Sequence, residues 1–80
     1  MPTIHRESGF RFFFYMNEGT EPPHVHIQGH GGEMKVWIPS LDVEFSYRLS
    51  PREQRIAMEI IAQNTKQFME KWNESAAQKK

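Results

Sequence analysis

The pattern of hydrophobic and polar residues predicts four strands ahead of Ser50. Residues 10–16 are aromatic on both faces of an extended chain, which is typical of a central strand covered on two sides. Three later segments alternate or are short and apolar between turn-forming residues, as strands do. We therefore expect strands over residues 10–16, 24–28, 33–38 and 43–49.

A long amphipathic helix is predicted after the last strand. Ser50-Pro51-Arg52-Glu53 is a capping box with proline at the first helical position, so the serine and glutamate side chains can satisfy the opening backbone donors. Apolar residues then recur at helical spacing as far as about Trp72. A helix over residues 51–72 would be roughly 33 Å long, enough to cross a small sheet. Residues 75–80 are expected to form a disordered tail.

Together these elements predict a single α+β domain over residues 1–74, in which a four-stranded, mainly antiparallel meander packs on one long C-terminal helix. The two faces of such a sheet differ. The side chains expected beneath the helix are Val25, Ile27, Met34, Val36, Ile38, Val43, Phe45, Tyr47 and Leu49. The opposite face is expected to carry Arg11, Phe13, Tyr15, His24, His26, Gln28, Lys35, Trp37, Glu44 and Arg48.

Composition narrows the class of protein. A chain of 80 residues suits one small domain, with about 60–65% of the unfolded surface buried. The formal net charge is zero, so no basic field draws the protein to nucleic acid without sequence preference. The absence of cysteine excludes a disulfide scaffold, a cysteine zinc site and thiol catalysis. No signal peptide or membrane-length segment is present, so we expect a cytoplasmic protein that does not bind membranes.

The uncovered face of the predicted sheet mixes aromatic and cationic side chains. Such a surface suits a protein interface, where Tyr, Trp, Phe and Arg are enriched, and it could also stack bases and contact phosphates. Alternatively, the aromatic rings simply cover one another. We favour a protein interface over RNA because the net charge is neutral. The binding residues that we expect are Arg11, Tyr15, Lys35, Trp37 and Arg48.

Three histidines lie close together in and after the segment Glu21-Pro22-Pro23-His24-Val25-His26-Ile27. In an extended chain, the rings of His24 and His26 point to the same side, roughly 7 Å apart. A metal site would use these two with His30, and Glu21 or Glu33 could replace a ligand. However, His30 lies in a glycine-rich turn and the His-x-His pair is a weak signal. We therefore expect no cofactor and regard His24 and His26 only as weak metal candidates.

The same pair of histidines could perform acid–base chemistry without a metal. In cleavage of RNA, one imidazole would accept the 2′-hydroxyl proton and the other would protonate the leaving oxygen. A cation from Arg11, Lys35 or Arg48 would then stabilise the charge on phosphorus. The third possibility is structural, with both rings anchoring the loop through hydrogen bonds to the backbone.

Several segments of the chain resemble one family of small bacterial proteins, domain of unknown function 4160. They are Met1-Pro2-Thr3, the run Phe10-Arg11-Phe12-Phe13-Phe14-Tyr15, Asn17-Glu18-Gly19, the element Glu21-Pro22-Pro23-His24-Val25-His26, the glycine-rich turn after it, the run Lys35-Val36-Trp37-Ile38, and Glu70-Lys71-Trp72-Asn73. The resemblance implies a stand-alone cytosolic domain whose gene often lies beside a second small gene, an arrangement interpreted as a toxin–antitoxin pair. It implies no established activity, and only Pro22, Pro23, His24 and His26 transfer as signature positions.

Two hypotheses follow from the sequence. In the first, the protein is a toxin–antitoxin component that binds a small partner protein, encoded nearby, through the open face that carries His24 and His26; self-association is the alternative to that partner. In the second, it is a small ribonuclease-like toxin that uses His24 and His26 as acid and base, with or without a metal.

Overall fold

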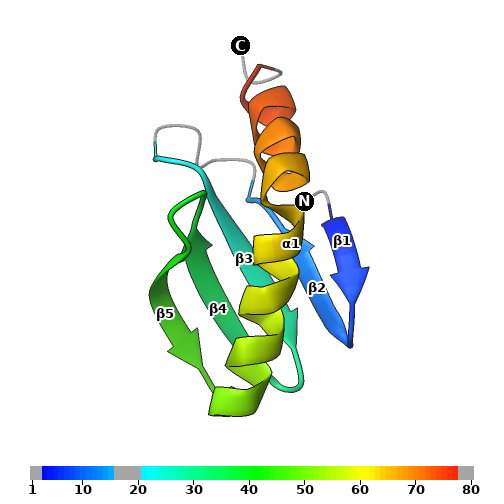
Figure 1. The fold of residues 1–80 in the computed structure, drawn as a ribbon, viewed down its shortest axis with the longest axis vertical. Helices are drawn as coiled ribbons and strands as arrows, with labels where there is room; N and C mark the ends of the chain where they lie inside the picture. Colours follow the sequence, from blue (N-terminus) through cyan, green and yellow to red (C-terminus); the bar gives the residue numbers. More distant parts are fainter. Residues whose placement is uncertain (1–2, 16–20, 78–80) are drawn as a thin grey trace.

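The computed structural model describes residues 3–15 and 21–77, and the side chains as far as Ser75. Five antiparallel strands form one sheet in the order β1-β2-β3-β4-β5, and one long helix crosses it (Figure 1). The elements are β1 (Thr3–Glu7), β2 (Phe10–Phe13), β3 (His24–Gly29), β4 (Gly32–Trp37), β5 (Asp42–Tyr47) and α1 (Pro51–Ala77). The predicted α+β class, the meander and the single C-terminal helix are confirmed.

The sheet has five strands, so the prediction of four is wrong. The additional strand is β1, which pairs with β2 through a two-residue turn at Ser8 and Gly9. Both turn residues have positive φ, 55° and 80°, as this kind of hairpin turn requires. β1 escaped the hydrophobic pattern because it lies at the sheet edge and has one aliphatic residue, Ile4, which packs against the core.

Some element ends also differ from the prediction. The aromatic run forms a strand only over Phe10–Phe13, and Met16 lies outside the described residues. The helix continues to Ala77, five residues past its expected end at Trp72. Of the predicted tail, residues 78–80 lie outside the described part of the chain.

The start of the helix is confirmed in detail. The backbone N–H of Ser50 donates to Oε1 of Glu53 over 2.9 Å, and the backbone N–H of Glu53 donates to Oγ of Ser50 over 3.1 Å. These two bonds are the reciprocal pair of a capping box. They fix the point at which the chain leaves the sheet and turns back across it.

The hydrophobic core lies between the sheet and α1. From the sheet it takes alternate side chains of β2, β3 and β4, and from the helix one apolar stripe that ends at Trp72. Its buried members are Phe10, Phe12, Phe14, Val25, Ile27, Met34, Val36, Ile38, Leu49, Ala57, Ile60, Ile61, Phe68 and Trp72.

Strand β5 departs from the predicted arrangement of faces. Its register against β4 shifts between Lys35 and Val36, so that Val36 pairs with Val43 but Lys35 pairs with Phe45. Residues directly opposite in a pair share a face, and therefore Phe45 lies with Lys35 on the face away from the helix. Tyr47, opposite Glu33, lies there too.

The prediction that Val43, Phe45 and Tyr47 lie beneath the helix is therefore wrong for Phe45 and Tyr47. Val43, opposite Val36, stays on the helix side but is exposed there. The exposed fractions of Val43, Phe45 and Tyr47 are 46%, 41% and 60%, respectively. The extra residue in β5 forms a bulge, which moves the following side chains to the other face. Leu49, beyond the strand, does reach the core as expected.

Candidate functional site on the open face of the sheet

The sheet face opposite α1, called the open face below, collects most of the residues singled out by the sequence. Strand register arranges its side chains in three rows that run across the sheet. The first row is Arg6, Arg11, Gln28, Glu33 and Tyr47, the second is Thr3, Phe13, His26, Lys35 and Phe45, and the third is His24, Trp37 and Asp42.

His24 is fully buried, at 0% exposure, although the sequence predicts it on the uncovered face. Its Nδ1–H donates to the backbone carbonyl of Pro22 over 2.9 Å. Its ring lies 5.2 Å from the ring of Trp37 and 4.9 Å from that of Trp72. His24 shares the face of Trp37 as predicted, but its ring is not exposed there, because Trp37 and Trp72, the latter from the far end of α1, pack against it.

The two prolines before β3 hold that position. The carbonyl of Pro22 accepts the bond from His24, and the carbonyl of Pro23 accepts the backbone N–H of Ile38 over 3.0 Å. Proline also favours extended backbone at the residue that precedes it. The Pro-Pro-His segment therefore joins the start of β3 to the end of β4.

His26 is also buried, at 4% exposure, and its Nδ1 lies inside the protein. Its ring stacks on Phe13 with centroids 5.6 Å apart, and the ring of Tyr15 meets it edge-on at 4.5 Å. The rings of His24 and His26 are 5.1 Å apart. The pair is thus assembled as predicted, but as an inner layer of the open face. Acid–base chemistry at these nitrogens would require the covering rings to move.

Charged and aromatic groups alternate at the outer surface of β3 and β4. Nζ of Lys35 lies 2.9 Å from Oε1 of Glu21 and 4.6 Å from the ring centroid of Trp37. Nε1–H of Trp37 donates to Oε1 of Glu44 over 2.9 Å. Carboxylates therefore stand on both sides of the Lys35–Trp37 pair, and they offset its positive charge.

Arg11 covers the other side of the buried layer. Its Cζ lies 4.4 Å above the ring centroid of Phe13, and its Nε–H donates to Oγ1 of Thr3 over 2.7 Å. Tyr15 meets Phe13 edge-on at 5.2 Å. As a result Phe13 is fully buried even though no helix lies on its side of the sheet.

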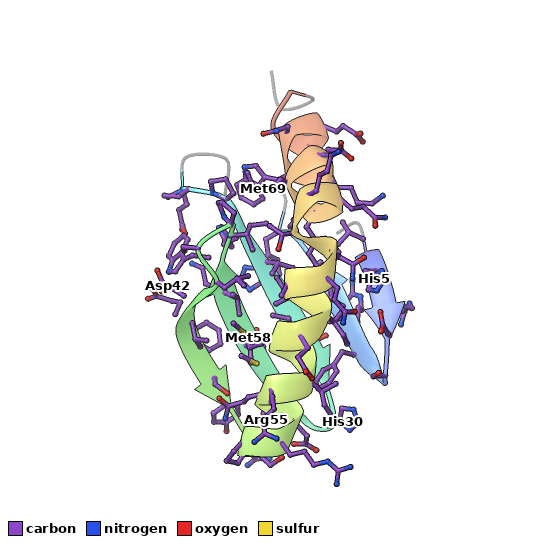
Figure 2. The ribbon with its side chains drawn as sticks, in the orientation of Figure 1. His5, His30, Asp42, Arg55, Met58 and Met69 are labelled. Atoms are coloured by element: carbon purple, nitrogen blue, oxygen red, sulfur yellow. The ribbon has the colours of Figure 1, made fainter. Side chains whose placement is uncertain are left out.

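His30 does not join the other two histidines. It follows the opposite end of β3, and its Nε2–H donates to the carbonyl of Ser8 over 2.9 Å. Its Nδ1 lies 3.8 Å from Oε2 of Glu53, beside the start of α1 (Figure 2). Within residues 3–15 and 21–77, no three His, Cys, Asp or Glu side chains are grouped closely enough to hold a metal ion.

Of the five predicted binding residues, four gather around the buried histidines: Arg11, Tyr15, Lys35 and Trp37. Arg48 lies apart, just after β5, with a left-handed φ of 56° and its Cζ 5.4 Å from the Tyr47 ring. Sequence reasoning missed Phe45 and Tyr47 on this face, because alternation runs unbroken through β5 and gives no sign of the bulge. It also missed Trp72 as the cover of His24.

The comparisons with known proteins agree with the resemblance seen in the sequence. A family model described as "Domain of unknown function (DUF4160)" matches residues 9–73. No curated protein and no solved structure matches the chain. In the part of the chain that the structure describes, α1 falls short of the apolar character that a membrane-crossing helix needs.

Proposed function

Because the chain belongs to the DUF4160 family, whose function is unknown, we propose a function from the geometry: it is a protein-binding module that docks a small partner protein on its open face. We place it in a two-component system of the toxin–antitoxin type, with the partner encoded next to it. Phe13, His24 and His26 form the rigid layer beneath the contact surface, and the partner meets the side chains above them.

The observation that carries this proposal is the set of aromatic side chains on the open face. Tyr15 and Trp37 are partly exposed above the buried layer, and Phe45 and Tyr47 extend the surface onto β5. Aromatic rings are the side chains most enriched at the centres of protein interfaces, where they contribute much of the binding energy. On a domain of this size, an exposed patch of this kind favours a partner over bare solvent.

The charges on the open face favour a protein over nucleic acid. Lys35 is bound to Glu21, and Trp37 is bound to Glu44, so acidic groups lie among the cations. A phosphate backbone gains affinity by releasing counterions to a run of Lys and Arg, and these carboxylates weaken that gain. A protein partner can meet both signs of charge with its own.

The proposal is tested by co-expressing the chain with the product of the adjacent gene and measuring affinity by calorimetry. Trp37→Ala should weaken binding about thirtyfold, the loss typical of a residue that contributes about 2 kcal/mol. Gln63→Ala, on the exposed side of α1, is the matched control and should bind as the parent does.

Two results would count against partner binding on this face. One is a complex that forms with unchanged affinity when Trp37 and Tyr15 are both replaced by alanine and circular dichroism shows an intact fold. The other is a complex whose affinity is lost with Gln63→Ala, which would place the interface on the helix.

A further inference from the structure

Strand β5 is an edge of the sheet, and its apolar side chains are exposed. All six of its residues are exposed, and among the described residues Val43, Phe45 and Tyr47 are the large hydrophobic side chains in that class. At the other edge, β1 sends Ile4 to the core and His5 to within 5.7 Å of the Phe68 ring. An exposed edge presents unpaired backbone N–H and C=O groups to any strand that fits it.

We propose that β5 pairs in antiparallel fashion with β5 of a second copy of this chain, forming one continuous sheet. The pairing shares Phe45 and Tyr47 with the surface proposed for the partner, but it rests on the strand edge and its charges and is tested separately. A two-fold interface requires a surface that complements itself, and β5 has one. Its first half is acidic, with Asp42 and Glu44, and the chain becomes basic at Arg48 directly after it.

Antiparallel pairing brings the acidic half of each strand beside the basic end of the other, twice around the two-fold axis. Opposite charges across a strand pair stabilise it, and like charges destabilise it. A parallel pair would instead place the two acidic halves side by side. The charges therefore select the antiparallel arrangement of two identical strands.

The bulge in β5 determines which residue lies on the two-fold axis that relates the two paired strands. With the axis at Ser46, Phe45 of each copy lies opposite Tyr47 of the other, and both are on the open face. Glu44 then lies near the end of the other strand, directly after which Arg48 follows. With the axis at Phe45, Val43 on the helix side would oppose Tyr47 on the open side, and with the axis at Glu44 two carboxylates would meet. The axis at Ser46 joins side chains that share a face and avoids both conflicts.

The oligomeric state of the purified chain is the first test. Sedimentation equilibrium should show twice the monomer mass, with dissociation on dilution. Phe45→Lys should leave a monomer, because it removes the apolar ring that packs on Tyr47 of the other copy and puts a strongly hydrated ammonium group in its place. Gln63→Lys adds the same charge on the exposed side of α1 and should still dimerise.

A charge exchange tests the antiparallel arrangement. Glu44→Arg alone sets two guanidinium groups against each other, and Arg48→Asp alone sets two carboxylates against each other. Each variant should therefore dimerise at least about tenfold more weakly than the parent. An equimolar mixture of the two should form a heterodimer, because the repulsion in each homodimer is relieved when the strands exchange partners. Glu44→Gln keeps an acceptor for Nε1–H of Trp37 and removes only the charge, so it should weaken the dimer less than Glu44→Arg.

A single cysteine locates the axis, because the chain contains none. Residues directly opposite in a strand pair have Cβ atoms about 4.5–5.5 Å apart, close to the separation that a disulfide spans. Ser46→Cys should therefore form a covalent dimer under mild oxidation. Gln63→Cys should remain uncrosslinked at the same concentration.

Three results would overturn the proposal. The first is a chain that stays monomeric up to about 1 mM, the weak end of measurable affinity. The second is a dimer that survives Phe45→Lys and does not crosslink through Ser46→Cys, which would place the interface elsewhere. The third is a monomer in which Phe45→Lys abolishes binding of the partner protein, which would assign β5 to that partner. Failure of the partner-binding experiment alone leaves the self-pairing intact.

Discussion

The imidazole of His24 lies between Trp37 on the sheet and Trp72 on the helix, with ring centroids 5.2 and 4.9 Å away. Its Nδ1–H holds the carbonyl of Pro22, and its ring also meets His26. A ring in this position links the loop before β3, the open face and the end of α1. Its first role, on this geometry, is to hold the surface that the partner contacts.

Replacement of His24 by alanine should therefore destabilise the fold. We expect His24→Ala to lower the free energy of unfolding by about 2–4 kcal/mol, because it leaves a cavity among three rings and removes the hydrogen bond to the carbonyl of Pro22. Urea titration followed by tryptophan fluorescence measures the change. His5→Ala, which removes a partly exposed ring from the edge strand β1, should cost less. A His24→Ala chain as stable as the parent, yet inactive in a cellular assay, would instead favour catalysis.

At the scale of the element, the start of α1 is tied to two parts of the sheet. Ser50 and Glu53 close the capping box, and His30 from the β3–β4 turn brings Nδ1 to 3.8 Å from Oε2 of Glu53. The hydrogen bond from the backbone of Ser50 is the largest cause that lowers the pKa of Glu53 below its ordinary value of 4.5, with His30 adding a smaller coulombic effect. The side chain of Glu53 therefore interacts with Ser50 and His30 more favourably when it is ionised than when it is protonated.

This lowered pKa predicts how stability depends on pH. The contribution of Glu53 is fully present above its unfolded pKa, and it is lost as the pH falls through the lower folded pKa. Glu53→Gln should therefore be less stable than the parent at neutral pH, and the difference should shrink below about pH 4.5, the ordinary glutamate value. Thermal unfolding followed from pH 7 to about pH 3 measures it. Glu59→Gln, on the exposed side of the same helix, should give no such change. A parent–variant difference that grows in acid would contradict the assignment.

At the scale of the molecule, the features that could be predicted from the sequence are those set by residues close together in the chain. The helix begins at the predicted capping box because Ser50 and Glu53 satisfy each other within one turn. Strand alternation correctly placed Arg11, Lys35 and Trp37 on one face. β1 could have been found from the Ser8-Gly9 dipeptide, since glycine and its neighbour supply the positive φ of a tight hairpin.

Features that depend on distant parts of the chain were not predictable in this way. The bulge in β5 arises from its register against β4, and the amino acids of β5 alternate as if it were absent. Likewise, the burial of His24 depends on Trp72, which only the folded chain brings near it. Both errors concern how exposed a side chain is. Exposure depends on how the sheet and the helix pack together, and the sequence of a single strand does not determine it.

The layered arrangement predicts where the chain can be shortened. Among the side chains described as far as Ser75, Trp72 is the last one buried in the core, and its ring meets Phe14 at 5.1 Å and His24 at 4.9 Å. A chain ending at residue 74 keeps these contacts, so its unfolding free energy should stay within about 0.5 kcal/mol of the parent, as for changes away from the core. A chain ending at residue 71 loses them and should be destabilised by about 3–5 kcal/mol, the usual effect of removing a buried tryptophan.

The loss expected for the chain ending at residue 71 is close to the whole free energy of unfolding of a domain this small, which is on the order of 5 kcal/mol. This chain should therefore be largely unfolded at about 37 °C, with far-ultraviolet circular dichroism as the measurement. Trp72→Ala in the full chain is the matched control: it removes the same ring and keeps the length of the helix, so it should reproduce most of the loss. If the chain ending at residue 71 folds as well as the one ending at residue 74, Trp72 does not hold α1 on the sheet. The burial of His24 on the open face would then not require its contact with Trp72 of α1.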